Sequence, residues 1–121
     1  MAFSWNSELP SGHNPFWIRD EALADLGLHT GDAVGVDTQR EPVDGDLVVV
    51  EVELEDDSLR IARRYFLHGD RVRLVGQTLV GQTVEALEVP VEKVMVMGVI
   101  AARLRVEGDE LKEEPLPGHP E

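Results

Sequence analysis

Four acids and one histidine lie close together between positions 20 and 32 of this 121-residue chain. Carboxylates beside an imidazole can bind a metal ion or transfer protons, provided that the side chains converge. Only Glu21 and Asp25 are spaced to share one face of a helix, so helix-start charges and turn-forming aspartates explain the run better. We therefore expect neither a metal ion nor a cofactor. The run consists of Asp20, Glu21, Asp25, His29 and Asp32.

The chain also contains the two residue types of a serine–lysine dyad. A lysine buried among apolar groups loses its preference for the charged form, so that its neutral amine can take the proton of a serine hydroxyl. Ser58 is expected at a polar hairpin tip, and Lys93 beside Glu92 is expected to be an ion-paired surface residue. A dyad built from such residues is the minor alternative. The residues available for it are Ser4, Ser7, Ser11, Ser58, Lys93 and Lys112.

Composition narrows the function classes further. The chain has no cysteine, which excludes disulfides, thiolate metal sites and a cysteine nucleophile. Its formal net charge is −13, and an acidic surface repels the phosphates that give DNA-binding proteins much of their affinity. Direct nucleic-acid binding is therefore not expected. The acidity indicates either a solvated surface or a face for a basic protein partner.

The length and a hydrophobic content of 42% are typical of one compact domain. No apolar run is long enough to cross a membrane, and the N-terminus lacks the segments of a secretory signal, so we expect a cytoplasmic protein. We assign residues 16–106 to the domain, 1–15 to an N-terminal arm and 107–121 to an acidic, disordered tail. The arm carries Phe3 and Trp5, and is expected to pack on its own domain, to fill a cleft in it, or to bind a partner.

Short apolar or alternating segments between Gly-Asp turns predict a mainly β protein with one short helix. The segment 47–54 begins as a continuous apolar run and becomes alternating, which indicates a strand that is buried on both faces and then emerges. Weak patterning over 77–88 indicates a loop with room for a short strand. Strands are expected at 16–18, 33–37, 47–54, 59–66, 71–75 and 94–104, and the helix at 20–26.

Gly-Asp pairs at 31–32 and 45–46 and the string Met-Gly-Val-Ile at 97–100 carry a resemblance to a known family. Their order and spacing over residues 16–105 resemble the peptidase domain of the LexA/UmuD family, whose members cleave themselves with a serine nucleophile and a lysine base. The resemblance implies a LexA/signal-peptidase-like fold, which is a coiled and largely antiparallel sheet.

Both catalytic positions of that family fall on alanine in this chain. The family serine lies in a Gly-Asp-Ser-Met-like turn, ten residues before the aspartate of the first Gly-Asp pair, and the corresponding residue is Ala22. The family lysine lies in a Val-Lys-Arg-like string at the end of a hairpin, which matches 61–63 and places Ala62 at the lysine. A register shifted by one residue would place Arg63 there, and arginine stays protonated. The family's Pro-Glu-Asn-like motif is also absent after Leu74. We therefore predict no catalytic residues and no enzyme activity.

Two further properties of the family need neither the serine nor the lysine. Its members hold an extended segment in a cleft, which here would include Leu23 and Arg63, and dimerise through the C-terminal strand. The resemblance thus implies a protein-binding module that forms a homodimer, or a heterodimer with a LexA-like relative, in a stress or DNA-damage response. The alternative is an active peptidase with non-standard residues. The expected dimer interface consists of Val94, Val96, Gly98, Val99, Ile100 and Leu104.

Overall fold

The computed structural model describes residues 12–77 and 83–116, which form one coiled sheet of eight strands. All strand pairings are antiparallel, in the order β1-β2-β7-β3-β4-β5-β6 with β8 paired to β7. The mainly β fold expected from the sequence is confirmed. The elements are β1 (Asn14–Trp17), η1 (Ala24–Leu26), β2 (Ala33–Asp37), β3 (Leu47–Glu53), β4 (Ser58–His68), β5 (Arg71–Gln77), β6 (Thr83–Pro90), η2 (Val91–Lys93), β7 (Val94–Glu107) and β8 (Glu110–Glu114).

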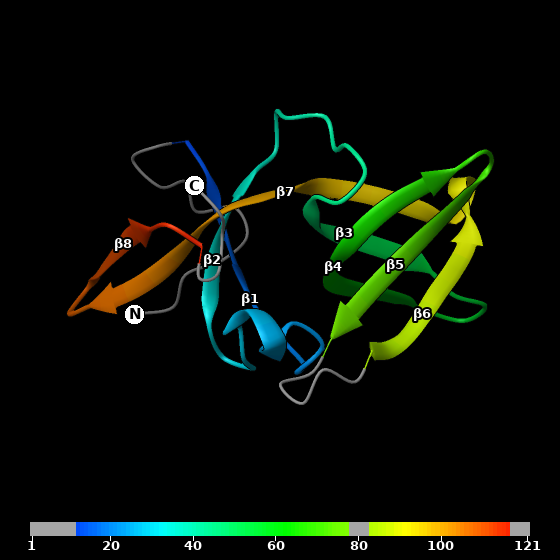
Figure 1. Cartoon of the computed structure of the whole chain (residues 1–121). Coiled ribbons are helices and arrows are strands. Elements are labelled where there is room, and N and C mark those ends of the chain that lie inside the picture. The colour runs from blue at the N-terminus through cyan, green and yellow to red at the C-terminus, as the bar shows by residue number, and fades with distance from the viewer. Residues whose placement is uncertain (1–11, 78–82, 117–121) are drawn as a thin grey trace.

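Strand β7 belongs to both halves of the molecule. Figure 1 shows β1, β2 and β8 at one end of β7 and the group β3–β6 at the other. The first part of β7 pairs with β3 from Val94 to Val99, the middle part pairs with β2 from Val99 to Leu104, and the last part pairs with β8. Register shifts in the β2 and β3 pairings bend the strand, as β-bulges do.

Gly98 allows β2 to pass close to β7. A Cβ atom at this position would lie 2.5 Å from Cγ1 of Val36 and 2.7 Å from the carbonyl oxygen of Asp37. A side-chain rotation cannot relieve either clash, because Val36 is fully buried and the Asp37 oxygen belongs to the backbone. A glycine within a strand commonly marks such a close backbone approach.

The two larger clusters of the described core share strand β3. Val49 contributes to a cluster with Phe16, Leu23 and Ala62, whereas Val48 and Val50 contribute to a second one within the β3–β6 half. All three valines are fully buried, because successive side chains of a strand point to opposite faces and here both faces are covered. The prediction that this segment is buried on both faces and emerges later is confirmed, since Glu53 at its end is exposed.

Two local predictions are wrong in part. The helix expected at 20–26 is reduced to the 3-10 turn η1, and a second 3-10 turn, η2, precedes β7. Gly27 ends η1 in a left-handed conformation, with φ of 80°, as its position suggested. The loop expected over 77–88 gives way from residue 83 onward to β6, which pairs with β5 along most of its length.

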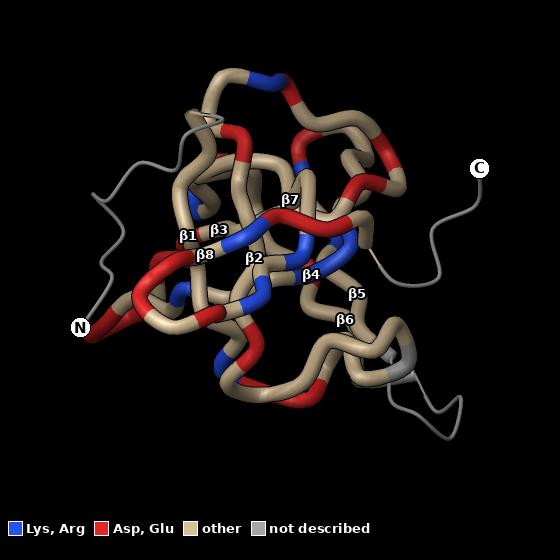
Figure 2. Tube along the Cα trace, turned by 90° about the vertical axis from the view of Figure 1, so that its left-hand side faces the viewer, with Lys and Arg blue, Asp and Glu red and all other residues tan. Residues whose placement is uncertain are grey.

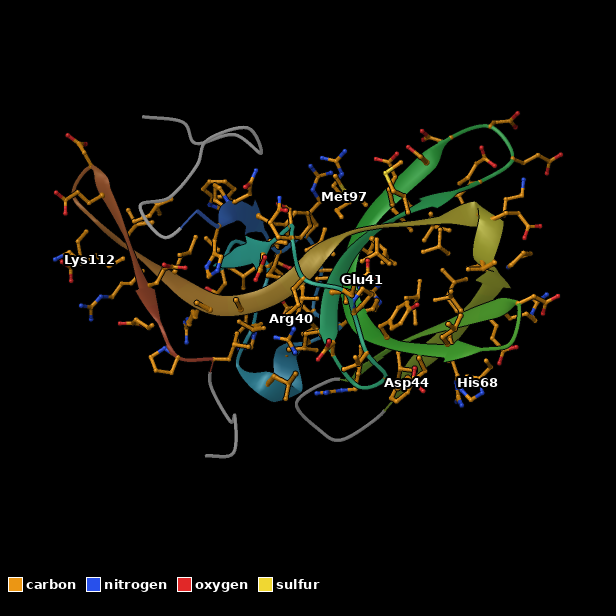
Figure 3. The ribbon with its side chains drawn as sticks, turned by 90° about the horizontal axis from the view of Figure 1, so that it is seen from above. Arg40, Glu41, Asp44, His68, Met97 and Lys112 are labelled. Atoms are coloured by element: carbon orange, nitrogen blue, oxygen red, sulfur yellow. The ribbon has the colours of Figure 1, made fainter. Side chains whose placement is uncertain are left out.

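The disordered tail expected over 107–121 is wrong for the part that the structure describes. Gly108 turns the chain with φ of 61°, and β8 then pairs with the end of β7. Ion pairs join Arg105 to Glu114 at 3.4 Å and Lys112 to Glu107 at 3.3 Å, so charged side chains reinforce the backbone ladder. Acidic residues predominate along β8 (Figure 2), and Lys112 lies far from the β3–β6 half (Figure 3). Residues 117–121 lie outside the described part.

The domain boundaries move accordingly. The ordered domain extends at least from β1, which includes two residues of the expected arm, to the end of β8. Residues 1–11 of the arm lie outside the described residues, so the three positions expected for the arm stay predictions. In the described ranges, no helix has the length and apolar character that a membrane span requires.

Replacing Gly98 by alanine is expected to lower the free energy of unfolding by about 2–3 kcal/mol, because overpacking a core commonly costs about 1–3 kcal/mol and the clash includes backbone. Gly35→Ala is the matched control: its methyl group would meet Oε1 of Glu113 at 2.9 Å, and this flexible side chain can move. We expect a loss below about 1 kcal/mol for the control in urea unfolding. Equal losses would contradict the constraint at Gly98.

Candidate functional site

Ala22 lies in the turn between β1 and η1 and is 4% exposed. The turn sits directly on strand β5, because a Cβ atom at Gly76 would be 2.7 Å from the Ala22 methyl group and 2.8 Å from the Ala22 carbonyl oxygen. Glycine at position 76 is therefore what permits the close packing. The methyl group of Ala22 is enclosed by the protein itself and does not face an open groove.

Ala62 lies in the middle of β4, opposite Val49 of β3, and is 5% exposed. It belongs to the same apolar cluster as Leu23, which directly follows Ala22. The structure thus brings the two alanine segments to one cluster, as the sequence predicted. An amine at position 62 would be surrounded by apolar side chains, the environment that favours its neutral form. We refer to Asp20, Ala22, Ala62 and Arg63 as the Ala22–Ala62 site.

An ion pair spans this site. Arg63 donates from Nη2 to Oδ2 of Asp20 at 3.0 Å and from Nη1 to Oδ1 at 3.3 Å, a two-point contact between guanidinium and carboxylate. Nη1 also donates to the carbonyl oxygen of Ala62 at 2.8 Å. The Arg63 side chain is 14% exposed. The arginine predicted to line the cleft is therefore bound to a specific acid, a partner that no local pattern in the sequence indicates.

Asp20 also occupies the backbone amide of Ala22. The Ala22 N–H donates to Oδ1 of Asp20 at 3.1 Å. Backbone N–H groups near a nucleophile are the usual donors of an oxyanion hole, and they act only if they point at the reacting carbonyl. Here the amide next to the methyl group at position 22 already has an anionic partner. The site combines two alanines, an engaged amide and a charge pair, which suits structural support better than proton transfer.

Three acids of the 20–32 run, Asp20, Glu21 and Asp32, do not converge on one point. Asp20 faces Arg63, whereas Glu21 accepts from the Thr30 N–H at 2.8 Å and lies 2.9 Å from Nδ1 of His29. Asp32 accepts from the His29 N–H at 2.9 Å. Within residues 12–77 and 83–116, no three His, Asp or Glu side chains are placed to hold a metal ion. Each acid instead fixes a part of the turn.

Glu21 shows the clearest electrostatic effect. The hydrogen bond with His29, followed by those with Thr30, lowers the pKa of the Glu21 carboxyl from its ordinary value of 4.5 to about 2. The side chain is exposed, so the shift reflects the contacts and not burial. Sequence reasoning treated this residue as helix-start charge, but the structure uses it to tie the Ala22 turn to the residues before β2.

Tyr65 on β4, the single tyrosine of the chain, is buried, and its hydroxyl is a candidate for a general acid or base. Burial raises the pKa of its hydroxyl, and the charges of Asp44 and Glu41 add to that effect. Both acids belong to the loop between β2 and β3, labelled in Figure 3. A raised pKa keeps the phenol neutral near pH 7, so Tyr65 is not a base there.

The other candidates for a dyad lie elsewhere. Ser58 begins β4 at the exposed hairpin tip, and Lys93 in η2 forms an exposed ion pair with Glu53 at 3.0 Å. The prediction of a paired surface lysine is confirmed, although the partner is Glu53 and not the neighbouring Glu92. Lys112 lies in β8. The serines at 4, 7 and 11 lie outside the described residues.

The residues expected at a dimer interface separate into two groups. Val94 and Val96 are half-buried and pack against the β3–β6 cluster, whereas Met95 between them is 61% exposed. β2 and β3 lie on opposite sides of β7, and β2 pairs only from Val99 onward, so no described strand occupies the β2 side of residues 94–98. The remaining four, Gly98, Val99, Ile100 and Leu104, are buried within the single chain.

The contacts of Glu21 make the stability of this turn depend on pH. A carboxyl whose pKa is lower in the folded state contributes stability above the unfolded value, 4.5, and loses it as the pH falls toward about 2. The stability difference between the wild type and Glu21→Gln should therefore shrink as the pH falls through this window. Glu55→Gln at the exposed hairpin tip is the control, without such a trend. Denaturant unfolding at each pH measures both; a constant Glu21 difference would contradict the assignment.

Comparison with known proteins agrees with the fold. A search of curated proteins found no match to this chain. A family model described as Peptidase S24-like matches residues 2–101, which is most of the chain and includes the Ala22 turn, the β3–β4 hairpin and the first part of β7. The chain therefore belongs to the Peptidase S24-like family, in which the LexA and UmuD peptidase domains are found.

Proposed function

We propose that this chain is a non-catalytic member of its family and acts as a protein-binding and dimerisation module. The observation that carries the proposal is the Ala22–Ala62 site, where methyl groups lie at the two positions that the family resemblance assigns to the serine and the lysine, and where an acid engages the Ala22 amide. In the same register, Asp20 stands at the glycine of the Gly-Asp-Ser-Met-like turn. Besides the serine and the lysine, the free backbone N–H donor of an active site is therefore also missing, because the Ala22 amide is bound to Asp20.

The energetics of the site favour retention of the scaffold without the chemistry. A buried amine must give up hydration, which disfavours its charged form and costs free energy unless a partner compensates. Alanine at position 62 avoids this penalty within an apolar cluster. Ala22 likewise fills the space that Gly76 leaves on β5. A fold built in this way can bind other chains without a reactive group.

The setting of this function follows from composition and from analogy with the family. The net charge of −13 opposes direct nucleic-acid binding, so the partners are proteins, either a second copy or a LexA-like relative. The cysteine-free sequence fits a cytoplasmic protein. A regulatory role in a stress or DNA-damage response rests on analogy with the LexA/UmuD family alone.

Absence of self-cleavage is the first expected result. The purified chain, incubated for days at alkaline pH, should keep its intact mass of 13.4 kDa, because no hydroxyl–amine pair occupies the Ala22–Ala62 site. Mass spectrometry after each interval measures this directly. Fragments at a single site would contradict the proposal, and Ser58→Ala and Lys93→Ala would then show whether these residues carry out the cleavage.

Dimerisation is the second expected result. The β2 side of residues 94–98 is the part of the predicted interface that a second β7 can reach, by antiparallel pairing of two strand edges. Light scattering should give about twice 13.4 kDa for the wild type and the monomer mass for Met95→Glu, because the glutamates of two copies would meet. Val106→Glu, at an exposed position later in β7, is the matched control and should remain dimeric. A monomeric wild type would contradict the dimer.

A further inference from the structure

Two arginines that form no ion pair with any side chain that the structure describes share the outer face of β4 and β5. Arg64 pairs with Val75 and Phe66 pairs with Arg73 in the antiparallel register. Directly opposite residues, and residues two apart on one strand, point to the same side of a sheet. The four side chains therefore form a continuous surface, which we call the β4–β5 face.

A small pocket opens at the Arg64 end of this face. It has a volume of about 150 Å³ and is lined by Leu23, Leu26, Arg64, Phe66, Val75 and Gly76. Four of these residues carry apolar side chains, and among the described lining residues the guanidinium of Arg64 is the charged group. The pocket adjoins the turn that holds Ala22, since Gly76 contacts that turn. Its size suits a single apolar side chain.

The two arginines of this face differ from most of the other arginines that the structure describes. Arg60, Arg63 and Arg105 all form ion pairs with carboxylates. By contrast, the contact found for Arg64 is a donation from Nη1 to the neutral carbonyl oxygen of Gly45 at 2.7 Å, and Arg73 forms no ion pair within the described part of the chain. The acid nearest to Arg73 in the sheet register is Glu88 of β6.

Glu88 is engaged elsewhere. Its carboxylate forms an ion pair with Arg71 at 3.7 Å, although its backbone pairs with Arg73. In a chain with a net charge of −13, many acids could have neutralised Arg64 and Arg73. The two guanidiniums instead remain available beside an apolar pocket. This combination is complementary to a ligand that carries carboxylates and an apolar group.

We infer that the β4–β5 face binds an extended, acidic segment of a partner protein, with two carboxylates on Arg64 and Arg73 and an apolar side chain in the pocket. The inference rests on the proposed protein-binding function. Diagonal neighbours on paired strands have Cβ atoms about 7–8 Å apart. Residues i and i+2 of an extended segment are separated by about 6.6–6.8 Å, so acids at that spacing fit both arginines. The matching pattern is an apolar residue followed by acids two and four positions later.

A peptide suits the face better than a nucleic acid. The high overall negative charge of the chain repels a continuous polyanion, and only two unpaired guanidiniums would oppose that repulsion here. The pocket next to Arg64 includes an aromatic side chain, Phe66, but its other apolar groups are leucine and valine side chains, which match an aliphatic side chain better than a base. A leucine side chain fits this lining without loss of hydrogen bonds.

Fluorescence anisotropy with the labelled peptide Leu-Ser-Glu-Ser-Glu tests the inference on the full chain. We expect measurable binding at about 0.05 M salt and much weaker binding at about 0.5 M, because exposed charge pairs are screened. Arg64→Gln and Arg73→Gln should each weaken binding about fivefold to tenfold. Arg105→Gln changes the net charge by the same amount but lies on the other half of the molecule. Because it does not contact the peptide, its effect on binding should be less than about twofold. Melting curves establish that all variants are folded.

Three control ligands complete the test. A peptide with lysine in place of both glutamates should not bind, and one with serine in place of leucine should bind more weakly. A single-stranded oligonucleotide that bound better than the acidic peptide, and lost binding in the same two variants, would overturn the peptide assignment. Absence of peptide binding, or equal loss in Arg105→Gln, would also overturn it. Such failures would leave the alkaline mass result and the dimer result intact, so they are distinguishable from failure of the proposed function.

Discussion

The close passage of β2 over β7 at Gly98 is the constraint on which the rest of the structure depends. Strand β7 can serve both halves of the sheet only if β2 reaches it at Val99, immediately beyond that glycine. The Gly31–Asp32 turn before β2 is held in turn by the chain after β1, where Ile18 N–H donates to Asp32 O at 2.8 Å and Gly31 N–H donates to Ile18 O at 2.9 Å. The position of the Ala22 turn above β5 therefore depends on the contact between β2 and β7 at Gly98.

The same arrangement explains why small residues at positions 22 and 62 fit the site. Ala22 touches the backbone of β5 through Gly76, and Ala62 faces an apolar cluster. The Arg63–Asp20 pair lies beside both and keeps its charges partly hydrated, since 43% of the Asp20 side chain is exposed. Partly buried pairs of this kind contribute modest stability, because desolvation offsets much of the attraction. Their effect is to fix geometry, and here the geometry fixed is the path of the turn at the Ala22 amide.

The sequence predicted those features whose cause lies in local patterning. The continuous apolar run of β3 and the alternation of β5 are visible in a few residues, and so are the glycine-containing turns before β2 and β3. β8 was missed because its residues are nearly all charged and it is held by the backbone ladder to β7 and by ion pairs, not by an apolar face. The Asp20–Arg63 contact was missed because 43 residues separate its partners, so only the folded sheet brings them together. The burial of Ala22 and Ala62 was predictable in part. The family pattern located the two alanines in the sequence, but their enclosure depends on Gly76 and Val49, which are distant in the sequence.

Arg63 and Arg64 show that neighbouring arginines of one strand can have different roles, one bound to an acid of the same chain and the other available to a ligand. They are neighbours in β4, yet Arg63 is neutralised by an acid from the turn after β1, whereas Arg64 donates to an uncharged carbonyl of the loop before β3. An acidic chain lowers its electrostatic self-repulsion by pairing each arginine with an internal carboxylate, so an arginine left unpaired forgoes some stability. Glu88 illustrates the point, because its carboxylate bonds to Arg71 while Arg73 lies opposite it on the adjacent strand. Charges left in this state beside an apolar pocket are better explained by an external carboxylate than by the folding of the chain alone.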